Sequence, residues 1–374
     1  MTKISPKEHI ASIEQYSGVK SIELIAAELN IPINNIIKLD GNENPFGPLP
    51  EVIKSLGALK NIHLYPDMLS TNLIKILAEK KKLKKKNLII GAGSDELIEL
   101  LIRAYANPSD TIMTIAPTFG MYSFLANAYG INFKQISQNL VKQETFAHYN
   151  LDESKFLEAV KDAKIVFICR PNNPDGRVIS EKFIKKLISL PVLVIIDEAY
   201  IEFSDFQSLA SWVPQYDNLI VLRTFSKAYS LGGIRVGYGV MPTDIRNVLL
   251  SIKQPYNVNI AGQEAAISAL SSPLVNLRVS EMKKTRKLFI NQLIILQKQL
   301  NNFWIHPSEA CYVLLTFESA KTSKKLYEYF YSKGILLRYY SSSDMVANIR
   351  ISIGLQEDME RVIEELKLFL KGEN

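Results

Sequence analysis

Thr224-Phe225-Ser226-Lys227-Ala228-Tyr229-Ser230-Leu231-Gly232-Gly233-Ile234-Arg235 is the stretch that decides the fold. The apolar run over 219–222 leads into it and predicts a buried strand, which places Lys227 at the carboxyl end of that strand. Open α/β sheets bind their ligands at this end. Two hydroxyls, Thr224 and Ser226, flank the lysine, and a glycine pair and Arg235 follow. Small, hydroxylated and cationic groups this close together suit a phosphate beside an amine.

Lys227 has two interpretations. Taken alone, a surface lysine on a turn is the simpler one, because short motifs have many false positives. The alternative is a lysine that forms a Schiff base with a phosphorylated aldehyde, which is the arrangement used with pyridoxal phosphate. The rest of the chain favours this alternative.

Length and composition indicate a globular protein with two domains. The chain has 374 residues, of which 47% are hydrophobic and 22% are charged. Its two cysteines, Cys169 and Cys311, imply no disulfide framework, and its four histidines are scattered without ligand spacing, so we expect no metal site.

Charge and hydropathy bear on partners and location. Much of the net charge of +6 comes from the lysine run over 80–86, which lacks interleaved aromatic residues and is better interpreted as a solvated helix end than as a nucleic-acid site. The N-terminus has no apolar core of a signal peptide, and no stretch is long enough to span a bilayer. We therefore expect a cytoplasmic protein that binds neither nucleic acid nor membrane.

Strands and helices alternate along most of the chain. We expect an N-terminal arm over 1–35, a large domain over 36–250 and a small α+β domain over 251–374. The near-continuous apolar strands of the large domain predict a mainly parallel sheet that helices cover on both faces. Predicted strands lie at 36–40, 88–90, 111–116, 131–137, 164–169, 192–197, 219–223 and 236–241. A long helical region is predicted from about 261 to 300.

Several loops that follow these strands carry polar groups suited to one ligand. Gly93-Ser94-Asp95 opens a helix and offers backbone amides to a phosphate. Asp197 ends an apolar strand, where a carboxylate needs a cationic partner such as a protonated pyridine nitrogen. Tyr200 and Asn173 can reach the phenolic oxygen of the same ring, and Phe119 is placed to stack on it. Helix capping by Asp197 and core packing by Phe119 are the alternatives.

These residues, in this order, resemble the fold type I aminotransferases that depend on pyridoxal phosphate, and among them the histidinol-phosphate aminotransferase family. The motifs that carry the resemblance are 41–45, 64–66, 93–96, 117–122, 171–174, 197–203, 224–235 and 348–354. The resemblance implies an α/β fold with a mainly parallel seven-stranded sheet between helices in the large domain, plus the smaller α+β C-terminal domain. It also implies a homodimer with shared active sites.

The resemblance implies a role for each matching residue. Lys227 looks like the lysine that holds the coenzyme and shuttles the proton, and Asp197 resembles the partner of the ring nitrogen. Tyr200 and Asn173 match the groups on the phenolic oxygen, and Asn173 is also expected to bind the substrate. The phosphate cup is matched by Gly93, Ser94, Asp95, Thr224, Ser226 and Arg235, and Tyr65 would reach the phosphate of the neighbouring subunit. Arg350 corresponds to the arginine that binds the substrate carboxylate, while Arg338 and Tyr16 resemble residues that face the substrate's own phosphate.

The implied reaction is transamination between glutamate and imidazole acetol phosphate. Two departures from the family pattern, Asp175 in place of threonine and Phe119 in place of tyrosine, bear on substrate preference. An aromatic amino acid aminotransferase and a threonine-phosphate decarboxylase-like enzyme on the same scaffold therefore stay open. A transcription regulator with an aminotransferase-like domain is disfavoured, since only about 40 residues precede the sheet region and they carry no helix-turn-helix motif.

Overall fold

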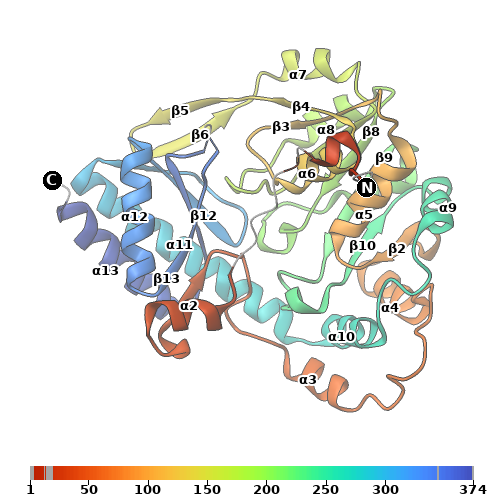
Figure 1. The fold of residues 1–374 in the computed structure, drawn as a ribbon, viewed down its shortest axis with the longest axis horizontal. Coiled ribbons are helices and arrows are strands. Elements are labelled where there is room, and N and C mark those ends of the chain that lie inside the picture. Colours follow the sequence, from red (N-terminus) through yellow and green to blue (C-terminus); the bar gives the residue numbers. More distant parts are fainter. Residues whose placement is uncertain (1–3, 12, 14–19, 343–344, 373–374) are drawn as a thin grey trace.

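The structure is a computed structural model that describes residues 4–11, 13, 20–342 and 345–372. Two seven-stranded sheets organise it (Figure 1). In the first sheet β10 alone runs against its neighbours, and the other six strands are parallel to one another. The strand order is β2 (Leu88–Gly91), β10 (Gly237–Val240), β9 (Leu219–Thr224), β8 (Leu193–Asp197), β7 (Ile165–Cys169), β3 (Thr111–Ile115) and β4 (Asn132–Ile136). The mainly parallel seven-stranded sheet is thus confirmed.

Both faces of this sheet are buried, which explains why its strands are apolar throughout rather than alternating. In β8, Ile195 belongs to the cluster under α5, α6 and α9, whereas Val194 and Ile196 belong to the cluster that α4, α8 and α10 cover. The helices are α4 (Thr71–Lys81), α5 (Ser94–Tyr105), α6 (Met121–Ala128), α7 (Glu153–Val160), α8 (Glu181–Ile188), α9 (Thr243–Ile252) and α10 (Ile260–Ser271).

The second sheet gathers strands from distant parts of the chain. Its order is β1 (Ile37–Leu39), β13 (Ile335–Tyr339), β14 (Asn348–Ser352), β12 (Tyr312–Phe317), β11 (Phe303–Ile305), β6 (Phe146–Asn150) and β5 (Asn139–Gln143). Helices α11 (Leu274–Leu300), α12 (Ala320–Ser332) and α13 (Gln356–Gly372) pack with it, and α1 (Glu8–Ala11), α2 (Ile22–Leu29) and α3 (Pro50–Gly57) complete the helices of the described chain.

The second sheet departs from the expected division of the chain. β1 and the hairpin of β5 and β6 fall within the range expected for the large domain, yet they pair with strands of the C-terminal region. The hairpin itself was not predicted. The two sheets therefore do not separate at one point of the chain, and the domain limits at 35 and 250 stay a proposal.

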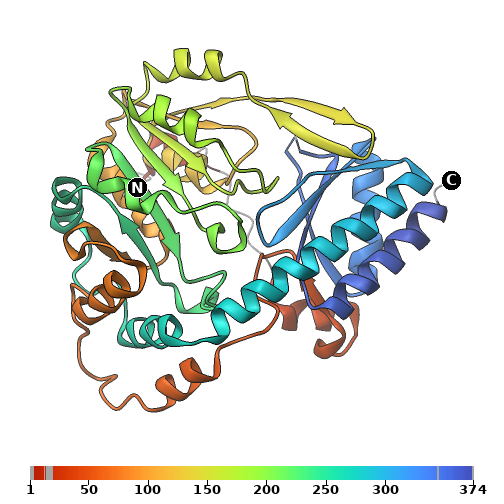
Figure 2. The ribbon, with the colours of Figure 1, turned by 180° about the vertical axis from the view of Figure 1, so that it is seen from behind.

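The long helical region predicted over 261–300 consists of two helices. α10 ends at Ser271 and α11 begins at Leu274. Pro273 between them cannot donate a backbone hydrogen bond, and the Ser272 Oγ accepts from the backbone N–H of Leu274 at 3.2 Å. α11 then runs from the first sheet to the second (Figure 2).

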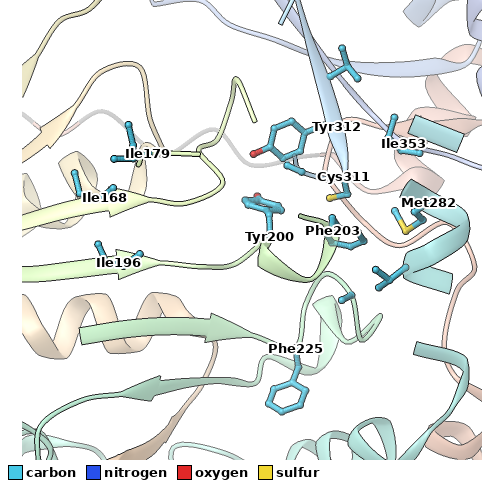
Figure 3. Packing of buried hydrophobic residues seen from close by; sticks show 14 of the residues in the cluster. Ile168, Ile179, Ile196, Tyr200, Phe203, Phe225, Met282, Cys311, Tyr312 and Ile353 are labelled. Atoms are coloured by element: carbon cyan, nitrogen blue, oxygen red, sulfur yellow. The ribbon is translucent and has the colours of Figure 1, made fainter. Parts of the chain in front are cut away.

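The hydrophobic core is continuous where the two sheets meet. Tyr200 and Phe203 come from the first sheet's loops, Met282 comes from α11, and Cys311 and Tyr312 come from the second sheet; all belong to one buried cluster (Figure 3). The rings of Tyr200 and Tyr312 meet edge to face with centroids 5.1 Å apart. This packing fixes the second sheet against the carboxyl ends of the parallel strands.

Candidate active site

Two cavities lie at the carboxyl ends of the parallel strands. The smaller, of about 240 Å³, is lined by residues that follow β2, β3, β7, β8 and β9, with two more from the loop after β1. It is formed by Gly41, Glu43, Ser94, Asp95, Phe119, Cys169, Asp197, Ala199, Tyr200, Thr224, Ser226, Lys227, Gly232 and Arg235. Most of the residues that the sequence analysis singled out thus lie together in one wall, because parallel strands end at one edge of a sheet.

The larger cavity, of about 540 Å³, adjoins the smaller one toward the second sheet. Gly41, Phe119, Tyr200 and Lys227 line both. The larger cavity adds Asn173, Arg338 and Arg350 with residues of the neighbouring loops. The amine of Lys227 therefore stands between a compartment of the first sheet and a compartment that both sheets enclose.

One end of the smaller cavity is built for an anion. Helix α5 begins at Ser94 without a side-chain cap, so its first backbone N–H groups are available to a ligand. Gly93 has a φ of 83°, and a Cβ there would lie 2.6 Å from the Arg235 guanidinium. Arg235 donates to Asp95 at 2.8 Å, and the Thr224 and Ser226 hydroxyls are hydrogen-bonded to each other at 3.0 Å. These donors suit a phosphate.

Asp197 provides a buried carboxylate at the other end. It accepts hydrogen bonds from the Tyr122 hydroxyl at 2.8 Å and from the Ala199 backbone N–H at 3.1 Å. Within the described residues it pairs with no cation, and burial raises its pKa to about 6 although the Tyr122 bond opposes the rise. A cationic ring nitrogen bound beside it would supply the missing partner.

Lys227 is a buried amine whose pKa is lowered by its surroundings. Burial lowers its pKa, and the nearby Arg350 acts in the same direction. Its Nζ donates to the backbone carbonyl of Gly41 at 2.9 Å, and it lies 5.9 Å from the centroid of the Tyr200 ring. The lowered pKa favours the uncharged form of this amine, which is the form that attacks an aldehyde and accepts a proton.

Tyr200, Asn173 and Arg350 form a polar group beside this amine. The Tyr200 hydroxyl accepts from the Asn42 amide at 3.1 Å, and burial raises the pKa of Tyr200, so it stays a neutral phenol. The Asn173 Oδ1 accepts from Arg350 Nη1 at 2.7 Å, which leaves the Asn173 NH₂ group to donate toward a ligand. Arg350 also donates to the Asp40 carbonyl at 2.6 Å.

The remaining predicted residues are placed differently. Arg338 lines the larger cavity, as expected for a group that faces substrate. Tyr65 lines neither cavity: it is 81% exposed and stacks on Tyr256 with ring centroids 4.5 Å apart. Tyr16 lies outside the described residues.

A buried network of charges supports the strand ends from behind. Glu198 is fully buried, accepts from the Leu209 backbone N–H at 2.7 Å, and lies 3.5 Å from Arg223 and 3.9 Å from Arg170. Arg223 also pairs with Glu202. This network ties the ends of β7, β8 and β9 together beside Asp197.

Two residues at the site carried no assigned role at the sequence level. Tyr122 is the second residue of α6, and nothing in its local pattern indicates that it reaches Asp197. Asn42 lies in the loop over 41–48, which is dense in turn-forming residues and polar amides. That composition is compatible with a site wall and with a plain turn, and it does not show which side chain Asn42 would touch. Both contacts join segments that are far apart in the chain.

The sequence of this chain is similar to those of known aminotransferases. The model of aminotransferase class I and II matches residues 34–366. The chloroplastic histidinol-phosphate aminotransferase of Nicotiana plumbaginifolia is 38% identical over 367 residues, covering 97% of this chain and 86% of that protein. Histidinol-phosphate aminotransferase of Roseiflexus castenholzii (strain DSM 13941 / HLO8) is 35% identical over 368 residues, covering 96% of each.

Solved structures share the fold. Histidinol-phosphate aminotransferase from Sinorhizobium meliloti, in complex with pyridoxal-5'-phosphate, aligns over 100% of both chains with a TM-score of 0.85 and 22% identity. L-threonine-O-3-phosphate decarboxylase from Porphyromonas gingivalis aligns over 90% of this chain and 100% of that one, with a TM-score of 0.77 and 22% identity. At such identities the likeness concerns the fold.

The described ranges show neither a membrane-spanning helix nor a metal-binding cluster. None of the helices there is long and apolar enough to cross a membrane. No group of three or more histidine, cysteine or acidic side chains in those ranges is arranged to hold a metal ion.

Proposed function

The chain belongs to the aminotransferase class I and II family, and on that premise we propose that it is a pyridoxal phosphate-dependent transaminase of histidine biosynthesis. It transfers the amino group of glutamate to imidazole acetol phosphate, giving L-histidinol phosphate and 2-oxoglutarate. The relatives named above support this choice of substrate.

The observation that carries the proposal is the position of the Lys227 amine. It stands at the junction of the two cavities, with an anion cradle and the unpaired carboxylate of Asp197 in the smaller one and Arg350 in the larger one. The donor set fits pyridoxal phosphate, because it offers an amine for the aldehyde, backbone amides for the phosphate and a carboxylate for the ring nitrogen.

Pyridoxal phosphate, when bound, supplies an electron sink for the charge that develops at the substrate's α-carbon. Asp197 keeps the ring nitrogen charged, while Tyr200 and Asn173 offer hydrogen bonds to the phenolic oxygen. Arg350 clamps the substrate carboxylate through its planar guanidinium. Lys227 would carry the proton to and from the substrate's α-carbon in both half-reactions.

We further propose that two copies share these sites. Apolar side chains are exposed along α3, along the loop that precedes α4, and at the end of α9, and the loop contacts the α9 end through the Tyr65–Tyr256 stack. The exposed residues are Ile53, Ile62, Leu64, Tyr65, Met68, Leu69, Ile252 and Tyr256. A homodimer through this face would bring Tyr65 to the phosphate of the neighbouring subunit. A cytoplasmic location stays part of the proposal.

Lys227→Ala tests the reaction. We expect the variant to lose both the visible absorbance of the lysine-bound coenzyme and at least about 10⁴-fold in turnover, since nucleophile and proton carrier are removed together. Lys284→Ala is the matched control, because the Lys284 side chain is 66% exposed and lines neither cavity. Transamination by Lys227→Ala at the wild-type rate would sink the assignment.

A half-reaction screen tests the substrate. Coenzyme-loaded protein is mixed separately with glutamate, histidinol phosphate, phenylalanine, tyrosine and threonine phosphate, and the spectrum is followed. Fast conversion by glutamate and histidinol phosphate alone supports the proposal. Preferred conversion by an aromatic amino acid, or release of carbon dioxide from threonine phosphate, would instead favour the alternatives on the same scaffold.

A further inference from the structure

Three residues of the segment 40–44 bond to reactive side chains, and a fourth bonds only to backbone carbonyls near Lys227. The Asp40 carbonyl accepts from Arg350 and the Gly41 carbonyl accepts from Lys227. The Asn44 amide donates to the carbonyls of Lys227 and Ala228 at 3.4 and 3.3 Å. Asn42, in the middle, is the member that touches Tyr200.

Ser352 determines how the Asn42 side chain is oriented. Asn42 is 2% exposed, and its backbone N–H donates to the Ser352 Oγ at 3.0 Å. The Ser352 hydroxyl donates its single proton to the Asn42 Oδ1 at 2.9 Å. The amide oxygen therefore faces Ser352 at the end of β14, and the NH₂ group faces the Tyr200 oxygen.

This orientation dictates where the Tyr200 proton points. The Asn42 NH₂ group occupies one acceptor position on the phenol oxygen, so the O–H bond must be directed elsewhere. Among the described residues the phenol finds no acceptor for that proton, and Tyr200 lines both cavities. Tyr312, the aromatic neighbour, donates its own hydroxyl to the Asn172 carbonyl at 2.7 Å and does not compete.

We propose that Asn42, held by Ser352, is a positioning residue that makes Tyr200 a hydrogen-bond donor to the phenolic oxygen of the bound coenzyme. The inference rests on the proposed function, since it needs the coenzyme beside Tyr200. Ser352 belongs to the second sheet, so through Asn42 and Tyr200 this sheet would influence the proton affinity of a coenzyme bound at the first sheet.

The test measures the pH at which the visible absorbance of the lysine-bound coenzyme changes. A donor on the phenolic oxygen stabilises the deprotonated form of the coenzyme–lysine linkage, so its loss must raise this pH. Asn42 has a φ of 54°, where glycine and aspartate are tolerated, so Asn42→Gly and Asn42→Asp remove the amide with little backbone strain. We expect Asn42→Gly to raise the midpoint by about one pH unit, the scale of one hydrogen bond.

Asn42→Asp gives a second, independent measurement. Its carboxylate accepts where the amide donated, draws the Tyr200 proton away from the coenzyme, and should raise the midpoint at least as far as Asn42→Gly does. Ser352→Ala should shift the midpoint in the same direction, whereas Ser352→Thr keeps the hydroxyl and should restore the wild-type value.

Matched controls separate positioning from loosening of the loop or of the fold. Asn44→Ala breaks bonds of the same loop without touching Tyr200, and Ser323→Ala removes a buried serine that bonds only to the carbonyls of Ala320 and Val346. Neither variant should move the pH midpoint by more than about 0.3 pH unit, which is smaller than the shift expected from the loss of a typical hydrogen bond.

The outcomes are distinguishable. Wild-type midpoints in coenzyme-loaded Asn42→Gly and Asn42→Asp would overturn the inference and leave the proposed function standing. Equal shifts in Asn44→Ala would also overturn it, because they would indicate general loosening. Wild-type protein that gains no visible absorbance with pyridoxal phosphate would contradict the proposed function itself. If Asn42→Gly fails to fold, the comparison of Ser352→Ala with Ser352→Thr decides.

Discussion

Asp197 illustrates how burial and function oppose each other at a single residue. The folded protein holds this carboxyl group among apolar strands, with Tyr122 and a backbone N–H as its partners. Its pKa rises from the ordinary 3.8 to about 6, chiefly through burial. The ionised form is thus costly until a cation binds beside it, which makes Asp197 selective for a charged ring nitrogen.

Asp197→Asn should therefore stabilise the coenzyme-free protein while weakening its chemistry. The folded chain binds the Asp197 proton more tightly than the unfolded chain does, so ionisation costs stability as pH rises from about 4 to about 6. At pH 7.5 the variant should gain on the order of 2 to 3 kcal/mol over wild type, and this advantage should fade toward pH 4. Urea unfolding at several pH values measures the difference; a pH-independent one would contradict the account.

For individual residues, the sequence indicated the polar groups at strand ends but not the side chains that hydrogen-bond to them. Lys227, Asp197 and Tyr200 stand beside apolar strands or turn-forming residues, which are local signals. Tyr122 and Asn42 act through contacts that cross 75 and 158 residues of chain, and no local pattern specifies such contacts.

Among the elements, the start of α5 depends on a neighbouring strand. Gly237 in β10 passes so close that a Cβ there would lie 2.5 Å from the Ser94 nitrogen and 2.6 Å from the Gly93 carbonyl carbon. The amides that suit a phosphate are therefore available only while position 237 lacks a side chain.

Gly237→Ala should damage both stability and anion binding. We expect a loss of about 1 to 3 kcal/mol from overpacking and a coenzyme affinity reduced at least about tenfold. Thermal unfolding and coenzyme titration measure the two effects. Gly233→Ala is the control, since a Cβ there meets nothing within 4 Å. Equal behaviour of the two variants would show that the cradle does not depend on this close approach.

The elements also show where local patterns mislead. Helical periodicity over 261–300 hides a break, because Pro273 is tolerated at the start of a helix as well as inside a loop. The hairpin of β5 and β6 escaped prediction because its strands are short and mostly exposed, with only alternate residues such as Ala147 and Tyr149 buried.

In the whole molecule, the site depends on two sheets that share one core. The parallel sheet could be predicted from its apolar strands. The position of the site could be predicted too, because the carboxyl ends of parallel strands meet at one edge of the sheet. The pairing of β1, β5 and β6 with the second sheet could not, since strand partners are set by tertiary packing rather than by neighbours in sequence.

The proposed dimer gives a prediction at this scale. In analytical ultracentrifugation the wild-type protein should have a mass of about twice 42.3 kDa, the mass of one chain. The Leu64→Glu variant should have a mass closer to that of the monomer, because the substitution would bury a charge in an apolar interface. Leu368→Glu on α13, with a similarly exposed side chain, is the control. A wild-type monomer at micromolar concentration would argue against shared sites.

Reduction of the coenzyme-loaded protein with borohydride, followed by mass mapping of its peptides, tests the central claim most directly. Reduction makes the link between coenzyme and lysine permanent, so the modified side chain can be identified. The account predicts one phosphopyridoxyl group per chain, on Lys227. A group on any other lysine, or none at all, would contradict it.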